Sequence, residues 1–278
     1  MACCDKKWIK VATYNVWHCG DYRLWKVPRD AGNKDIVNTD NVGEFMYRYG
    51  IEICTLNEMM KGTYVSDYKD QAEEIARYMT EKTGEKYYSA FGEAAPQPAW
   101  GGNPAGGSYG NAIVSKYPIK NVQPDGYIVK DTTLISIPYE ERIEGVSGYE
   151  TRALVKAVLD VDGKELVVMT GHFGLVKEER QKAVEAVRDA LTTINGPALL
   201  MGDFNARPDS EEYDAFAKLM VPTAAKEDLP FTFPTGELRV VLDYILHTPD
   251  VVSKDLKAIP EVISSDHIPL TATIGMPM

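Results

Sequence analysis

The chain has 278 residues, of which 44% are hydrophobic and 26% are charged, a composition typical of a globular protein with one large core. We therefore expect a single domain over residues 1–278. No apolar run approaches the roughly 20 residues of a membrane-spanning helix, so we expect no transmembrane segment. The formal net charge of −11 disfavours a surface that binds duplex DNA indiscriminately, because such binding depends largely on Lys and Arg. It does not exclude a local basic groove or bound metal ions.

The N-terminal segment bears on the compartment in which the protein works. No signal peptide is visible before the polar residues 5–7, which favours the cytoplasm. The alternative is that Ala2-Cys3 is the remnant of a trimmed lipoprotein signal, so a secreted form stays open. The four cysteines show no spacing typical of a metal finger, and we expect free thiols in a monomer.

The first half of the chain shows two hydrophobic patterns. Short apolar runs rich in β-branched residues indicate buried strands, and apolar residues three or four apart indicate amphipathic helices. In chain order they predict strands at 8–15 and 51–56, a loop over 20–40 leading into a helix that ends near Tyr49, and a helix over 67–83. The Gly, Pro and Ala residues from Ala94 to Ser108 predict a long loop. Long loops in compact domains are often functional.

The second half predicts more strands. They are expected at 111–115, 127–130, 153–161, 165–171, 198–201, 241–246 and 269–274. Asp162-Gly163 is typical of a hairpin turn, and a charged segment with apolar residues at helical spacing predicts a helix from Lys177 to about Thr193. Strands interleaved with a few helices favour two packed sheets with helices on the outside.

Polar side chains suited to metal or phosphate chemistry stand at or just after the ends of six apolar runs. Open sheets present their ligand sites at such strand ends. The segments are Thr13-Tyr14-Asn15, Leu56-Asn57-Glu58, Thr170-Gly171-His172, Gly202-Asp203-Phe204-Asn205, Leu242-Asp243-Tyr244 and Ser265-Asp266-His267. Each alone is weak evidence, because an Asp after a strand is more often a helix cap or a turn residue.

The order and combination of these segments resemble the endonuclease/exonuclease/phosphatase superfamily, which includes deoxyribonuclease I. The resemblance runs from Val11 to about Leu270 and includes the supporting segments 109–118 and 150–154. It implies an α/β fold, a four-layer sandwich in which two packed, mainly antiparallel sheets are flanked by helices, with the site at one rim of the sheets. It also implies an Mg²⁺-dependent enzyme that hydrolyses phosphate esters with an activated water.

The resemblance assigns metal binding to three side chains with oxygen donors. Mg²⁺ prefers octahedral oxygen ligands and is usually held by one or two carboxylates together with waters and substrate phosphate. By resemblance Glu58 is the main ligand and Asn15 lies beside it, while Asp266 completes a second metal site or bonds within the first. Mn²⁺ and Ca²⁺ are the alternative ions.

The same resemblance assigns the catalytic roles. Asp203 orients or deprotonates the attacking water, Asn205 holds a phosphate oxygen, and Arg152 binds phosphate or organises neighbouring carboxylates. His267 contacts the scissile phosphate, and Asp243 fixes the tautomer of His267.

His172 distinguishes branches of the superfamily, since apurinic endonucleases carry a tyrosine there. In the deoxyribonuclease-like branch this histidine pairs with a glutamate, for which Glu93 is the candidate. Asn57 departs from the usual glutamine before the catalytic glutamate, which changes contacts near Glu58 without removing it. His18 and His247 lie outside the motifs and are assigned no role, and the acidic runs 178–180 and 211–212 indicate solvated helix faces.

The substrate stays open, because the motifs encode phosphate chemistry and not the leaving group. The alternatives are a nuclease acting on DNA or RNA, a phosphatase of small phosphorylated compounds, a sphingomyelinase-like lipid phosphodiesterase, and a catalytically inactive binding protein on the same fold. The acidic bias of residues 130–149 disfavours a clamp on duplex DNA.

Overall fold

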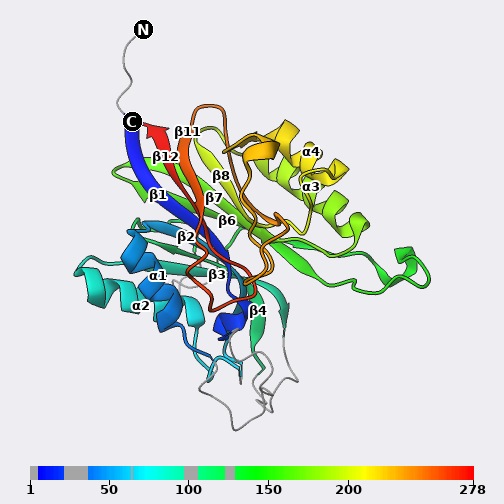
Figure 1. The fold of residues 1–278 in the computed structure, drawn as a ribbon, viewed down its shortest axis with the longest axis horizontal. Coiled ribbons are helices and arrows are strands. Elements are labelled where there is room, and N and C mark those ends of the chain that lie inside the picture. The colour runs from blue at the N-terminus through cyan, green and yellow to red at the C-terminus, as the bar shows by residue number, and fades with distance from the viewer. Residues whose placement is uncertain (1–5, 22–36, 64, 97–105, 123–128) are drawn as a thin grey trace.

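The structure is a computed structural model that describes residues 6–21, 37–63, 65–96, 106–122 and 129–278. It contains two six-stranded sheets (Figure 1). In spatial order the first sheet consists of β11 (Val252–Ala258), β12 (Leu270–Pro277), β1 (Lys6–Asn15), β2 (Ile53–Lys61), β4 (Ser108–Ser115) and β3 (Tyr88–Pro96). The second consists of β5 (Thr132–Ile135), β6 (Arg152–Val161), β7 (Lys164–His172), β8 (Ala198–Asp203), β10 (Asp243–His247) and β9 (Val221–Pro222).

Within the described residues, four α-helices cover the outer faces of the two sheets. α1 (Asp40–Tyr49) and α2 (Gln71–Thr83) lie on the first sheet, and α3 (Lys177–Leu191) and α4 (Glu211–Leu219) lie on the second (Figure 1). The short 3₁₀ helices in the part of the chain that the structure describes are η1 (Trp17–Cys19), η4 (Tyr139–Glu141) and η5 (Lys226–Asp228). The predicted four-layer sandwich is confirmed.

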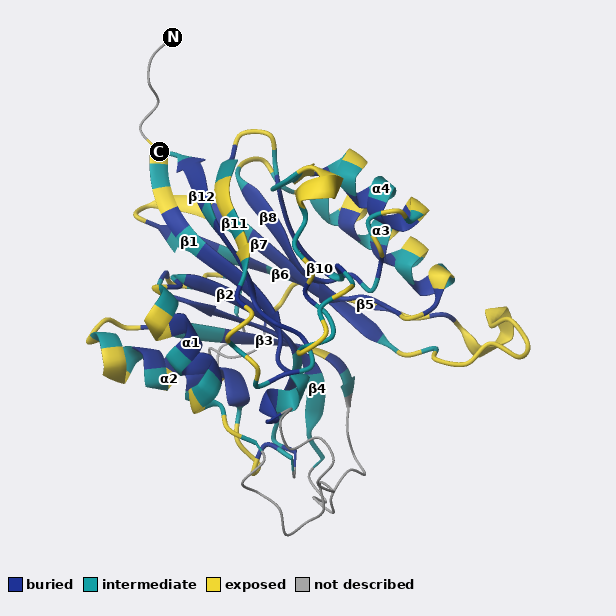
Figure 2. Cartoon of the chain, in the orientation of Figure 1, coloured by how far each residue is buried: buried dark blue, intermediate teal, exposed yellow. Residues whose placement is uncertain are grey.

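The central strands are buried on both faces, so each contributes to two cores (Figure 2). In β2, Ile53 packs into the core between the sheets, whereas Cys54 and Leu56 pack against the helices outside. Successive side chains of a strand point to opposite faces, which explains this alternation. Burial on both faces also explains why these strands appear in the sequence as continuous apolar runs.

Most neighbouring strands run antiparallel, as predicted, and two pairs are parallel. β1 pairs with β2, and β7 pairs with β8, in parallel register. Parallel neighbours end at the same edge of a sheet, so the carboxyl ends of these four strands present their last side chains in adjacent positions. That edge carries the predicted site.

Helix α2 begins at Gln71, four residues later than the predicted helix over 67–83. Asp70 is the N-cap, and its carboxylate accepts hydrogen bonds from the backbone of Ala72 and Glu73. Asp67 and Tyr68 have φ values of 54° and 61°, which a right-handed helix does not admit. The helical spacing of apolar residues extends back to Tyr68, but the helical backbone begins only at Gln71.

Several elements differ from the prediction. β5, β9 and β11 were not predicted, and α4 was expected only as a helix face at 211–212. The strand expected at 127–130 is not formed by its described residues, since Val129 makes only an isolated bridge and 127–128 lie outside the described residues. The acidic runs on α3 and α4 are not wholly solvated, because Glu179 and Glu212 are buried. No helix in the described ranges is long and apolar enough to cross a membrane.

Candidate active site

The register of the second sheet brings three predicted residues side by side. His172 lies opposite Asp203 in the β7–β8 pair, and Asp203 lies opposite Asp243 in the β8–β10 pair. Residues directly opposed in neighbouring strands point to the same face of the sheet. All three are buried. Three titratable groups therefore share one small volume.

The first sheet supplies Asn15 and Glu58 to the same volume. A register shift in the β2–β4 pair marks a bulge at Glu58, whose φ is 60°, and a bulge re-aims a side chain. Asn15, the last residue of β1, places its Nδ2 3.2 Å from Glu58 Oε1 and 3.1 Å from Asp203 Oδ2. One amide thus donates to carboxylates of both sheets.

His267 lies between two carboxylates. Its Nδ1 is 2.8 Å from Asp243 Oδ2, and its Nε2 is 3.5 Å from Asp203 Oδ2. A carboxylate accepts, so Nδ1 donates to Asp243, as predicted from the resemblance. Burial alone lowers the pKa of His267, but the charges of Asp243 and Asp203 outweigh it and raise the pKa to about 10. Burial raises the pKa of Asp203 as well.

His172 has a different environment and a different tautomer. Its Nδ1 lies 3.1 Å from Arg152 Nη1 and 3.1 Å from the hydroxyl of Tyr109. A guanidinium only donates, so Nδ1 accepts and Nε2 carries the hydrogen, which faces Asp203 Oδ2 at 3.5 Å. Burial lowers the pKa of His172 well below its ordinary value, and the charge of Arg152 lowers it further. This ring is neutral, and its Nε2 lies close to the carboxylate of Asp203.

The remaining predicted site residues that lie in this volume are Arg152, Asn205 and Asp266. Arg152 Nη2 lies 2.8 Å from Glu150 Oε2. Asn205 donates from Nδ2 to the Phe173 carbonyl oxygen at 3.0 Å, which leaves its second amide hydrogen for a ligand. Burial raises the pKa of Asp266, and the nearby carboxylate of Glu58 contributes to the rise.

These side chains line a hollow of about 700 Å³. Eight of the nine predicted site residues line it, namely Asn15, Glu58, Arg152, His172, Asp203, Asn205, Asp266 and His267. Asp243 is not among the lining residues, and it contacts His267, which is. Arg152 is the only Lys or Arg among the described residues that line the hollow.

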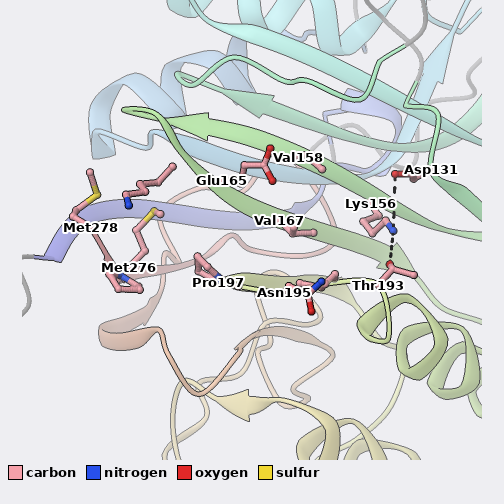
Figure 3. Close-up of a pocket in the computed structure, with 14 residues that line it drawn as sticks. Asp131, Lys156, Val158, Glu165, Val167, Thr193, Asn195, Pro197, Met276 and Met278 are labelled. Carbon is pink, nitrogen blue, oxygen red and sulfur yellow. Dashed lines mark hydrogen bonds and ion pairs between the residues drawn. The ribbon is translucent and has the colours of Figure 1, made fainter.

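A second hollow, of about 620 Å³, lies where β7 and β8 begin (Figure 3). Its charged side chains include Lys156, which donates to Thr193 Oγ1 at 3.0 Å and lies 3.9 Å from Asp131. The rest of its wall is largely aliphatic and includes Met276 and Met278. The two hollows are similar in size and differ in chemistry.

Two sequence-based expectations about the site are wrong. His18 was assigned no role, yet it lines the site, with its Nε2 3.5 Å from Glu58 Oε2. Glu93 was expected to pair with His172, but it accepts a hydrogen bond from Ser108, while the carboxylates near His172 are those of Asp203 and Glu58.

Asn57 holds the backbone of the site through buried hydrogen bonds. Its Oδ1 accepts the backbone N–H of Asp203 at 3.0 Å, and its Nδ2 donates to Asn111 Oδ1 at 2.9 Å. This buried amide therefore joins the two sheets directly beneath the cluster. His247 is a buried packing residue, bonded to Ser253 and to the Thr248 carbonyl oxygen.

The donor set fits a hard divalent cation. Glu58 and Asp266 are neighbouring carboxylates, and Asn15 lies beside Glu58; oxygen-rich groups of this kind suit Mg²⁺ or Mn²⁺. Asp203, Asp243 and His267 also bring donor atoms within 4.8 Å of one another. In that second group the carboxylates already flank the imidazole of His267, and Asp243 Oδ1 is buried with no hydrogen-bond partner among the described residues.

The family of this chain follows from a comparison with models of known protein families. The model of the Endonuclease/Exonuclease/phosphatase family matches residues 12–267. The chain belongs to this family. The match contains every predicted site residue, which agrees with the resemblance seen in the sequence motifs.

Relatives of known structure in the endonuclease/exonuclease/phosphatase family have the same fold. A protein of this family from Beutenbergia cavernae DSM 12333 aligns with a TM-score of 0.70 and 18% identity, covering 98% of this chain and 72% of its own. The mannosyl-6-phosphatase Bt3783 of Bacteroides thetaiotaomicron VPI-5482 aligns at 0.63 and 17%, covering 96% and 99%. D. rerio TDP2 complexed with a single-strand DNA product aligns at 0.59 and 15%, covering 96% and 99%. At these identities the likeness is one of fold.

Among curated proteins, YbhP of Escherichia coli K12, an uncharacterized protein, is 30% identical over 103 residues. The match covers 36% of this chain and 34% of YbhP, so it spans about a third of the relative's length.

Proposed function

We propose that this protein is a divalent-metal-dependent hydrolase of phosphate esters. The observation that carries the proposal is the convergence of Glu58, Asp203 and His267, from separate strands and loops of both sheets, in one hollow. Buried charges are costly, and their grouping in a hollow is typical of a catalytic site.

Glu58 and Asp266 would hold the cation, with Asn15 beside Glu58. A bound divalent ion supplies positive charge to the phosphate oxygens and to the leaving oxygen. Mg²⁺ is the expected ion, and Mn²⁺ is an alternative that the same oxygen donors accept.

Asp203 is the proposed base for the attacking water. Its Oδ1 accepts from the backbone N–H of Asn205 at 2.9 Å, and its Oδ2 accepts from Asn15 Nδ2, so the carboxylate is held in one orientation. The Nε2 of the neutral His172 ring lies 3.5 Å from the same Oδ2. Burial raises the proton affinity of Asp203, which suits a group that accepts a proton from water.

His267 and Arg152 are the proposed donors to the phosphate. The imidazolium of His267 is stabilised by Asp243 behind it, so it can donate to a non-bridging oxygen as negative charge builds. Arg152 and the second amide hydrogen of Asn205 would bind further phosphate oxygens. Water attacks phosphorus in line with the leaving oxygen, and no covalent enzyme intermediate is required.

The hollow favours a compact phosphate ester over duplex DNA. Arg152 is the single Lys or Arg among its described lining residues, and the carboxylate of Glu150 lies next to it. Duplex binding depends on many phosphate contacts from basic side chains. Of the solved structures with this fold, one is a mannosyl-6-phosphatase and one binds single-stranded DNA, so both a phosphorylated sugar and a single strand belong in the test.

The test is hydrolysis by the purified protein with Mg²⁺ or Mn²⁺ against EDTA. The substrates are bis-p-nitrophenyl phosphate, p-nitrophenyl phosphate, mannose 6-phosphate, single-stranded DNA, plasmid DNA and sphingomyelin. We expect at least one substrate to be cleaved, and expect EDTA, Glu58→Ala and His267→Ala each to abolish that cleavage. If no substrate is cleaved and calorimetry detects no cation binding that depends on Glu58, the catalytic proposal fails and a binding protein on this fold replaces it.

A further inference from the structure

His18 lies in a strained turn that directs it into the site. The turn follows β1 directly, and Trp17, His18 and Cys19 have φ values of 45°, 58° and 56°. Residues with side chains rarely adopt this left-handed conformation, and it persists only where surrounding contacts enforce it. Such outliers gather at functional sites, and Glu58 and Asn205 are outliers in the same hollow.

Gln71 holds this turn against β2. Its Nε2 donates to the His18 carbonyl oxygen at 2.8 Å, and its Oε1 accepts the backbone N–H of Met60 at 2.8 Å. Gln71 is itself buried at the start of α2. The ring of His18 lies edge-on to that of Tyr109, with centroids 5.8 Å apart. The imidazole is therefore placed by contacts on its backbone and on its ring.

The contacts of the ring define which nitrogen carries the hydrogen. Nδ1 of His18 lies 3.2 Å from the backbone carbonyl oxygen of Glu58, which only accepts, so Nδ1 donates. When the ring is neutral, Nε2 presents its lone pair, and Glu58 Oε2 lies 3.5 Å from this nitrogen. Two electron-rich atoms face each other, an arrangement that a cation between them stabilises.

We propose that His18 Nε2 and Glu58 Oε2 bind one divalent cation together, and that this nitrogen ligand makes the site prefer Mn²⁺ to Mg²⁺. The inference rests on the proposed metal-dependent function and adds a ligand that the motifs do not contain. Donor atoms about 2.1 Å from one ion, at angles of about 90–110°, lie about 3.0–3.5 Å apart, which matches the observed separation. Imidazole suits Mn²⁺ and later transition metals, whereas Mg²⁺ favours oxygen donors throughout.

The experiment measures cation affinity and not turnover. Mn²⁺ binding is followed by electron paramagnetic resonance and calorimetry, and Mg²⁺ affinity is obtained by competition. The wild type is compared with three variants, His18→Ala, His18→Gln and Lys156→Ala. His18→Gln retains an oxygen donor in place of the imidazole, and Lys156→Ala is a control in the second hollow. Circular dichroism and thermal unfolding establish that each variant is folded.

We expect His18→Ala to weaken Mn²⁺ binding about tenfold or more while Mg²⁺ affinity changes less than about threefold. His18→Gln should likewise lower the ratio of Mn²⁺ to Mg²⁺ affinity, and Lys156→Ala should leave it unchanged. Equal loss for both ions, no change, or tighter Mn²⁺ binding in His18→Ala, as removal of an imidazolium would give, overturns the inference. Absence of any cation binding that depends on Glu58 instead contradicts the proposed function itself.

Discussion

The two hollows at opposite ends of β7 and β8 have volumes of about 700 and 620 Å³, yet only one resembles an active site. The first gathers buried carboxylates and imidazoles, including Asp203 and His267. The second has Lys156 already bonded to Thr193, an exposed Glu165 and a largely aliphatic wall. Volume therefore does not identify the site. The site is identified by buried charged side chains that lie close together, because a folded protein tolerates buried charges only where partner groups hold them in place.

Among the substitutions that compare the two hollows, removal of the proposed base Asp203 should lower activity the most. Asp203→Asn keeps the shape of the side chain but cannot take a proton from water. We expect kcat/KM to fall about 10³-fold, or about 4 kcal/mol in transition-state stabilisation. Lys156→Gln, in the second hollow, should change kcat/KM less than about twofold. Comparable losses in the two variants would remove the distinction between the hollows.

Asp243→Asn should have the next largest effect, although Asp243 does not line the hollow. The variant removes the charge that stabilises the imidazolium of His267 and permits the other tautomer. We expect kcat/KM to fall about 10²-fold and the pKa of His267 to drop from its raised value toward the ordinary range. Nuclear magnetic resonance of the imidazole measures that pKa directly. An unchanged pKa would mean that Asp243 is not the group that charges His267.

Asn57→Ala should affect stability together with activity. It leaves the backbone N–H of Asp203 and the amide oxygen of Asn111 without their partner inside the protein. We expect the free energy of unfolding to fall by about 2 kcal/mol, measured by chemical denaturation. Asn195→Ala, an exposed residue of the second hollow, is the matched control and should change it by less than about 0.5 kcal/mol. Equal destabilisation by Asn57→Ala and Asn195→Ala would show that the hydrogen bonds of Asn57 between the sheets do not stabilise the fold.

Glu179→Gln should have the smallest effect, and a stabilising one. Glu179 is buried and accepts the backbone N–H of Glu150 at 2.7 Å, while its Oε2 has no hydrogen-bond partner among the described residues. Burial raises the pKa of Glu179 above its unfolded value, so its ionisation opposes folding as pH rises through the shifted range. We expect the free energy of unfolding of the variant to exceed that of the wild type by about 1 kcal/mol at pH 8, and to show no pH-dependent excess below about pH 3, where the carboxyl is protonated in both states.

The matched control for Glu179→Gln is Glu165→Gln, in which the exposed carboxyl lines the second hollow. It should change the free energy of unfolding at pH 8 by less than about 0.5 kcal/mol, because substitutions of exposed residues usually have small effects. A stability gain of the same size at low and high pH in Glu179→Gln would contradict the assignment of the effect to ionisation.

The sequence predicted the interior of the fold better than its edges. β7 and β8 appear as apolar runs because they are buried on both faces, and their terminal polar residues were correctly placed at one end of the sheet. β11 has no buried residue and alternates irregularly between half-buried and exposed positions, and its register shifts between Lys254 and Lys257, so it has no periodic signal. α4 has only nine residues, and its clearest marker is the cap at Ser210.

The motif residues of the site were predictable, but residues placed by unusual backbone were not. His18 enters the hollow through a left-handed turn that no glycine or asparagine announces. Glu93 lies at a register shift in the β3–β4 pair, which directs it to Ser108. Glu179 is buried because Gly174 leaves room for it; a Cβ at that glycine would collide with the carboxylate. The single domain and the monomeric state stay predictions.

The most direct test of the central claim locates the cation itself. Crystals of the protein soaked in Mn²⁺ would be measured at a wavelength where manganese scatters anomalously. We predict an anomalous peak within bonding distance of Glu58 in the wild type, its loss in Glu58→Gln, and none beside Lys156 in either protein. A wild-type crystal at saturating Mn²⁺ with no peak at Glu58, or with its peak in the second hollow, would contradict it.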